Sequence, residues 1–134
     1  MAQIIPSAEH IRQMFERYAF CLSEGDVEGV VSLFAPEALL EDPIGTEYRG
    51  HAAIRDFFQR SFNGVGGRIR FEPEGPVRIH NEHAACAFTA ICDRVDPPFE
   101  VDTLDIARFD EQGQFGSLVA IWSQANVRTG GSLK

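Results

Sequence analysis

The sequence has few cysteines and no long hydrophobic run. Only three of its 134 residues are cysteine, at positions 21, 86 and 92, and they show no CxxC pair and no histidine at the spacing of a metal site. We therefore expect reduced thiols, no metal and a cytoplasmic location. No apolar stretch approaches the ~18 residues of a membrane span. The opening MAQIIPSAEH also lacks the basic region of a secretory signal.

Basic residues are scarce as well. Twelve Lys and Arg stand against 20 Asp and Glu, which gives a formal net charge of −8. An acidic surface repels phosphate backbones and gains nothing from an anionic membrane, so we expect neither nucleic acid nor membrane as a partner. A neutral or weakly polar small molecule remains compatible with this charge.

The pattern of apolar residues predicts three helices in the first half of the chain. Helical spacing follows the N-cap Ser7 and continues to Gly25, then runs from Asp26 to Phe34, where Pro36 closes the second helix. A short strand at 38–42 precedes a turn at 43–45. The third helix follows Gly50 and ends at the glycine-rich stretch 63–67.

The second half of the chain reads as strands separated by turns. Extended runs are predicted at 68–72, 77–80, 84–92, 99–109 and 115–127. Three N-terminal helices followed by successive strands predict an α+β fold, with the helices packed on one face of a curved, mainly antiparallel sheet. We expect residues 1–134 to form one domain.

Asp105 departs from the pattern of its strand. In the strand 99–109, Asp105 shares the more apolar face with Val101, Thr103 and Ala107, whereas Asp102 lies on the more charged face. A carboxylate on a buried face is costly unless it is paired or protonated, and burial raises its pKa. Asp105 is therefore either a neutral hydrogen-bond donor in a site or part of a satisfied polar network in the core.

Two further polar residues border apolar segments. Tyr18 lies on the apolar stripe of the first helix, where a tyrosine commonly donates to a backbone carbonyl. Asp42 precedes Pro43, an ordinary way to begin a turn, but its neighbours Leu40 and Ile44 are apolar. A partly desolvated carboxylate at the mouth of a pocket is a suitable base for a carbon-bound proton.

With these three residues located, the chain resembles the ketosteroid isomerases over most of its length. The matching stretches are RYAFCLSEGDVEGVVSLFAPEALLEDPIG at 17–45, GHAAIRDFFQRSF at 50–62, LDIARFDEQGQ at 104–114 and the strand around Trp122. The resemblance implies the conical α+β barrel named after nuclear transport factor 2, and a homodimer. Segments 63–67 and 94–100 depart from the family pattern, and we expect them to shape the rim of the pocket.

The resemblance also implies roles for individual residues. Asp42 falls on the family's general base, and Tyr18 and Asp105 fall on its two oxyanion donors. The implied reaction converts a 3-oxo-Δ5 steroid into its Δ4 isomer without a cofactor. Ketosteroid isomerase is itself a standard example of a carboxylic acid kept neutral by an apolar site. Phe34 and Phe58 occupy positions where some members of the family carry tyrosines.

Aromatic and aliphatic residues supply candidates for a steroid pocket. The chain has 11 Phe but only two Tyr and one Trp, and phenyl rings suit a flat apolar ligand. The candidate lining residues, each also a plausible core residue, are Phe57, Phe58, Phe88, Val101 and Trp122.

Two other kinds of function stay open on the sequence. One is another enzyme of the same fold, a polyketide cyclase or an epoxide hydrolase-like protein. Such hydrolases hold water with an Asp-Arg-Asp arrangement, but Arg108 lies on the strand face opposite Asp105. The other is a non-catalytic dimer that binds a small ligand, in which Tyr18 and Asp105 would only be polar groups of the core and loss of Asp42 would leave function intact.

Overall fold

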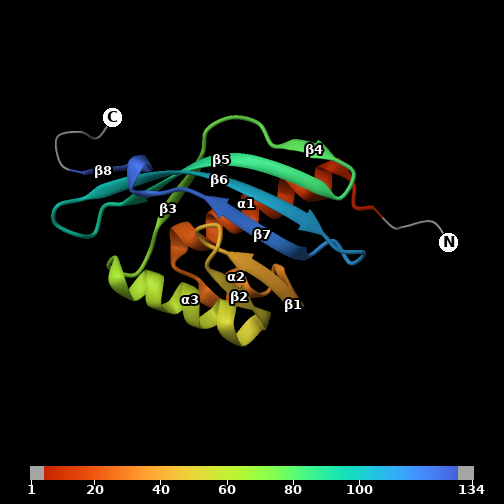
Figure 1. Ribbon diagram of the computed structural model, residues 1–134, viewed down its shortest axis with the longest axis horizontal. Coiled ribbons are helices and arrows are strands. Elements are labelled where there is room, and N and C mark those ends of the chain that lie inside the picture. The colour runs from red at the N-terminus through yellow and green to blue at the C-terminus, as the bar shows by residue number, and fades with distance from the viewer. Residues whose placement is uncertain (1–4, 130–134) are drawn as a thin grey trace.

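A computed structural model describes residues 5–129, and Figure 1 shows helices packed against one large curved sheet. The helices are α1 (Ala8–Glu24), α2 (Val27–Val31), α3 (Gly50–Gly64) and the 3-10 turn η1 (Gln124–Asn126). The strands are β1 (Phe34–Glu41), β2 (Glu47–Arg49), β3 (Arg70–Pro73), β4 (Arg78–His80), β5 (His83–Cys92), β6 (Phe99–Phe109), β7 (Phe115–Ile121) and β8 (Val127–Thr129).

The sheet is open and of mixed direction. Its strand order is β2-β1-β7-β6-β5-β3, with β4 also paired to β5 and β8 to β6. Neighbouring strands are antiparallel except β1 and β7, which run parallel with Leu40 opposite Leu118. The predicted α+β class and its mainly antiparallel sheet are confirmed. The parallel pair was not predicted, because nothing in a local pattern says which distant strand will be a neighbour.

The first helix forms where the sequence predicts it. The side chain of Ser7 accepts a hydrogen bond from the backbone N–H of His10 at 3.1 Å, which caps the helix. Gly25 ends the helix in the left-handed region, with φ of 67°. A Cβ at this position would lie 2.0 Å from the carbonyl oxygen of Gly67, so the end of α1 also touches the glycine-rich segment.

The second helix is shorter than predicted. It ends at Val31, and Phe34 begins β1 instead of closing the helix. Phe34 is fully buried and pairs with Phe115 of β7, while the Phe115 N–H donates to the Leu33 carbonyl at 2.9 Å. Sheet pairing therefore overrides the helical spacing of this apolar residue.

The strands differ from the prediction at two further places. The short strand β2 was missed, since its residues are largely exposed and carry no apolar alternation. The last predicted strand breaks after Ile121, because Ser123 caps the η1 turn and redirects the chain to β8. β8 pairs with the beginning of β6.

Phenylalanine rings form the centre of the core between α1 and the sheet. Phe115 is fully buried, and its ring contacts those of Phe15, Tyr18, Phe34 and Phe109 at centroid distances of 5.7, 5.8, 5.3 and 5.1 Å. These edge-to-face and tilted contacts fix Tyr18 from the side of the sheet.

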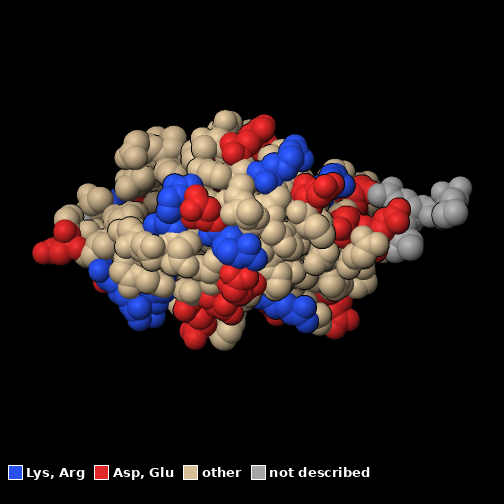
Figure 2. Space-filling view, turned by 90° about the horizontal axis from the view of Figure 1, so that it is seen from below, with Lys and Arg blue, Asp and Glu red and all other residues tan. Residues whose placement is uncertain are grey.

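The surface is acidic but mixed. Figure 2 shows Lys and Arg interspersed with Asp and Glu on the face seen from below, which includes α3. Arg55 pairs with Glu28 at 2.7 Å and Arg60 with Asp56 at 2.9 Å. No helix within residues 5–129 is long and apolar enough to cross a membrane. The cytoplasmic location and the absence of a nucleic-acid partner stay predictions.

Candidate active site

Asp42 stands at the end of β1, in a turn fixed by the backbone. Its N–H donates to the Thr46 carbonyl at 3.1 Å, which closes the connection to β2, and the peptide bond to Pro43 is cis. The N–H of Ile44 donates to the Ala120 carbonyl at 2.8 Å. The turn is therefore tied to both β2 and β7, and the carboxyl group of Asp42 is directed into the interior.

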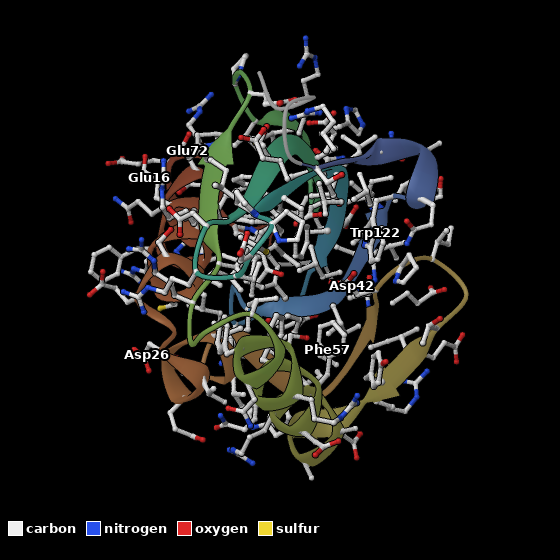
Figure 3. The ribbon with its side chains drawn as sticks, turned by 90° about the vertical axis from the view of Figure 1, so that its left-hand side faces the viewer. Glu16, Asp26, Asp42, Phe57, Glu72 and Trp122 are labelled. Carbon is white, nitrogen blue, oxygen red and sulfur yellow. The ribbon has the colours of Figure 1, made fainter. Side chains whose placement is uncertain are left out.

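Trp122 holds the Asp42 carboxylate from the neighbouring strand. The indole N–H donates to Oδ1 of Asp42 at 2.7 Å, and the two side chains lie side by side in Figure 3. Because β1 and β7 run parallel, the segments that follow these two strands leave the sheet at the same end. This places residue 42 beside residue 122.

The pKa of Asp42 reflects two opposing influences. The side chain keeps some solvent exposure, but the surrounding apolar groups raise its pKa to about 6, and the hydrogen bond from Trp122 works against that rise. Near neutral pH the group is therefore largely ionised, yet it is a stronger base than an exposed aspartate.

Tyr18 is buried among aromatic rings. Only 2% of it is exposed, and its ring contacts Phe34, Phe58 and Phe71 at centroid distances of 6.5, 6.3 and 5.6 Å. Within residues 5–129 no side chain or backbone group forms a hydrogen bond with its hydroxyl. Burial, and then the negative charges of Asp105 and Asp42, raise its pKa well above the ordinary value. The hydroxyl thus stays protonated and can donate.

Asp105 lies deeper than Asp42. It is 1% exposed and stands on β6 between Cys86 of β5 and Ala120 of β7. Burial is the first cause that raises its pKa, to about 8, and the charge of Asp42 is the second. Thr103 donates from its hydroxyl to Oδ1 of Asp105 at 3.0 Å, which lowers the pKa in part. At neutral pH Asp105 is therefore a neutral acid that can donate a hydrogen bond.

These side chains meet in one cavity of about 260 Å³. Its wall is mostly apolar, and among residues 5–129 no Lys, Arg or His lines it. No group of three or more His, Cys, Asp and Glu side chains in the described ranges is arranged to hold a metal ion. The lining residues are Tyr18, Leu22, Asp42, Phe57, Phe58, Ser61, Val65, Ile69, Phe71, Ala90, Cys92, Phe99, Val101, Thr103, Asp105, Ala120 and Trp122.

Comparisons with known proteins agree with this architecture. The family described as SnoaL-like domain matches residues 11–117. The Steroid Delta-isomerase of Nocardioides simplex is 33% identical over 122 residues, which make up 90% of this chain and 95% of that protein. This chain belongs to the SnoaL-like, steroid Delta-isomerase family. The resemblance inferred from residues 17–45, 50–62, 104–114 and the strand around Trp122 is thereby confirmed, and the chain is related to an enzyme over nearly its full length.

Other relatives of this SnoaL-like domain carry different chemistry. Epoxide hydrolase LasB of Streptomyces lasalocidi is 38% identical over 76 residues, or 55% of this chain, and the match spans only 26% of LasB. The solved structure of SalBIII, an epoxide hydrolase/cyclase-like enzyme of pyran ring formation in salinomycin, has a TM-score of 0.80 and 21% identity. It covers 91% of this chain and 97% of its own, and it establishes the shared fold.

Four of the five candidate lining residues lie on the cavity wall of this SnoaL-like domain, and Figure 3 labels two of them, Phe57 and Trp122. Phe58 and Val101 are the others. Phe88 does not lie on this wall, and a role for it in substrate binding stays a prediction. Phe88 is 1% exposed, and the ring of Phe71 stacks on it at 4.3 Å, so Phe71 faces the cavity in its place.

The two segments that depart from the family pattern meet at the cavity. Val65 from 63–67 and Phe99 from 94–100 both line it, while their place at its rim stays a prediction. A Cβ on Gly66 would lie 2.6 Å from the Cβ of Arg94, so the two segments are in direct contact. Both segments therefore contribute to the cavity wall.

Sequence reasoning missed two contributions to the site. Thr103 was placed on the same strand face as Asp105, and that alternation was a signal for their hydrogen bond. Trp122 was assigned only to the wall. No local signal indicates its hydrogen bond to Asp42, because the bond depends on the parallel pairing of distant strands.

Proposed function

We propose that this protein is a steroid Delta-isomerase that converts 3-oxo-Δ5 steroids into 3-oxo-Δ4 steroids. One observation carries the proposal: three polar side chains converge in an apolar cavity, and the two acids among them have separated pKa values, about 6 for Asp42 and about 8 for Asp105. Between these values one acid is a base and the other a proton donor. Tyr18 is the second donor.

The proposed mechanism is an intramolecular proton transfer. The Asp42 carboxylate removes a proton from the carbon between the ketone and the double bond, and the electrons move onto the ketone oxygen to give a dienolate. Tyr18 and protonated Asp105 donate hydrogen bonds to that oxygen, where they stabilise the developing charge. Asp42 then returns the same proton to the far carbon of the conjugated system, so no external acid or cofactor enters the proton balance.

The cavity suits a flat, apolar ketone. Asp105, Thr103, Val101 and Phe99 all line it from alternate positions of β6. At about 3.4 Å per residue this row extends for about 20 Å. A polycyclic substrate with its ketone at Asp105 would lie along the row and be held mainly by burial.

The absence of a cation among the lining residues favours isomerase chemistry over the alternatives from the relatives. Arg108, the nearest arginine in sequence to Asp105, is exposed on the opposite face of β6. The part of the chain that the structure describes therefore offers no Asp-Arg-Asp arrangement in the cavity to hold a hydrolytic water. The epoxide hydrolase-like and cyclase functions and the non-catalytic ligand carrier become outcomes of the following test.

The test is turnover of 5-androstene-3,17-dione, followed by the absorbance of the conjugated enone. We expect Asp42→Asn to abolish turnover while the fold and steroid binding persist, because an amide cannot accept the proton. Glu41→Gln is the matched control. Glu41 is the adjacent carboxylate outside the cavity, it accepts from the Gly45 N–H at 3.0 Å, and an amide oxygen can still accept there. Full activity of Asp42→Asn would exclude Asp42 as the base, and binding without turnover in the wild type would indicate a carrier.

We further propose that the protein is a homodimer formed through the outer face of the sheet. Leu104, Ile106 and Ile121 point outward there with 40%, 38% and 41% of their surface exposed. Leu104 lies opposite Ile121 in the register of β6 and β7, so the three side chains form one apolar area. We expect Ile106→Glu to convert a dimer into a monomer in sedimentation analysis. A monomeric wild type would refute the proposal.

A further inference from the structure

Thr103 and Asp105 form a hydrogen-bonded pair inside the cavity. They lie two residues apart on the buried face of β6, with exposures of 8% and 1%, and both line the cavity. The Thr103 hydroxyl donates to Oδ1 of Asp105 at 3.0 Å. Thr103 is the one hydrogen-bond partner of this carboxyl group within residues 5–129.

The two oxygens of a neutral carboxylic acid are not equivalent. One carries the proton and donates, and the other is a carbonyl oxygen that accepts. Since Oδ1 of Asp105 accepts from Thr103, the proton of the neutral acid belongs on Oδ2. An acid without this partner could carry its proton on either oxygen, and only one of the two arrangements would present it to the substrate.

We propose that Thr103 is a positioning residue that keeps the acid proton of Asp105 on Oδ2, ready to donate to the substrate oxygen. The inference rests on the proposed isomerase function, because it gives that proton a use. Hydrogen bonds in a chain also polarise one another, so donation to Oδ1 strengthens the donation from Oδ2. The proposal concerns the hydroxyl group of Thr103 and not its methyl group or its packing.

The groups that face Asp105 determine how it titrates. Asp42 approaches from the end of β1, Tyr18 from α1 and Cys86 from the opposite position on β5, whereas Ala120 of β7 cannot ionise. Among the residues around it, Thr103 is the one whose contact favours the ionised form. Removing the hydroxyl should therefore raise the pKa of Asp105.

The experiment compares Thr103→Val, which has nearly the same shape, with Thr103→Ser, which keeps the hydroxyl. For Thr103→Val we expect kcat to fall about tenfold, the kinetic equivalent of about one net hydrogen bond. The high-pH limb of the rate profile, where Asp105 ionises, should move to higher pH while the low-pH limb stays in place. Thr103→Ser should restore both properties.

Thr89→Val is a matched control. Thr89 is also 8% exposed and lies on the neighbouring strand β5, but its hydroxyl donates to Glu74, outside the cavity. Its loss should leave the pH profile unchanged. If Thr103→Val matches the wild type in kcat and in both limbs, or loses activity without a shift of the upper limb, the positioning role is refuted.

A second measurement separates this inference from the proposed function. The carboxyl carbon of Asp105 can be titrated by NMR in protein labelled with 13C-aspartate, without any substrate. We expect Thr103→Val to raise the observed pKa and Thr103→Ser to leave it near that of the wild type. An unchanged pKa in Thr103→Val refutes the role of Thr103, even if the wild type isomerises steroids. If the pKa of Asp105 rises in Thr103→Val but the wild type does not isomerise steroids, the isomerase function is refuted and, with it, the catalytic use of the proton.

Discussion

Replacing Trp122 by Phe tests how the base is tuned. The change removes the indole N–H, which donates to Asp42 at 2.7 Å, but keeps an aromatic ring on the cavity wall. Because this donor stabilises the ionised carboxylate and lowers its pKa, its loss should raise the pKa of Asp42. The base would then become protonated at a higher pH than in the wild type.

The size of the effect follows from the geometry. A hydrogen bond to a charged group contributes about 1.5 to 3 kcal/mol, and the lower end applies here because both side chains keep some exposure. About 1.4 kcal/mol corresponds to one pKa unit, so the pKa of Asp42 should rise from about 6 to about 7. The ionised fraction at pH 7 would fall from about nine-tenths to about one-half. Activity should therefore fall about twofold at pH 7 and about fivefold at pH 6.

The assay is kcat/KM for the steroid ketone from pH 5 to pH 10, which reports the ionisations of the free enzyme. The low-pH limb of Trp122→Phe should lie about one pH unit higher, while the upper limb stays near 8, where Asp105 ionises. Phe57→Leu alters another aromatic part of the wall and should leave both limbs in place. A low-pH limb that does not move, or that moves to lower pH, would refute the assignment of Trp122.

Two further predictions concern Asp105. Asp105→Asn should retain much more isomerase activity than Asp105→Leu, because the amide can still donate, and the Leu variant should lose about 100- to 1,000-fold in kcat; equal losses would exclude the donor role. Burial raises the pKa of Asp105 in the folded protein, whereas the unfolded side chain ionises from about pH 4. Ionisation of the unfolded chain favours unfolding, so the free energy of unfolding of the wild type should fall from about pH 4 to about pH 8. Urea unfolding should show this decline between about pH 6 and pH 8 in the wild type and not in Asp105→Asn, because the raised pKa of Asp42 accounts for a decline only up to about pH 6; parallel declines of the two proteins above pH 6 would contradict the burial of a neutral acid.

Much of the fold could be predicted because its signals are local. Ser7 and Gly25 delimit α1, and the alternation along β6 places Asp105 inside and Arg108 outside, as observed. Phe34 was assigned to a helix because its spacing suits one, whereas its pairing with Phe115, 81 positions away, decides the outcome. The spacing of apolar residues within a short segment contains no information about a partner strand so far away.

The site could likewise be predicted only where its signals are local or come from the family resemblance. Tyr18, Asp42 and Asp105 were located from the face or turn that each occupies together with the family resemblance, and all three line one cavity. The position of Phe88 behind Phe71 could not be predicted, because the alternation on β5 indicates burial but not which ring covers a side chain. The distinction between core and cavity wall depends on Phe71, a residue of another strand.

The parallel pairing of β1 and β7 has a consequence for how the protein acquires its chemistry. Asp42 is made early during synthesis, but the strand that sets its environment follows about 80 residues later, and such long-range pairings are slow to form. A nascent chain that ends before β7 could complete α1 and the hairpin of β1 and β2 while its future base remains an ordinary aspartate in water. Activity should thus appear only when the last strands join the sheet, so recovery of turnover during refolding would report the closing step of assembly.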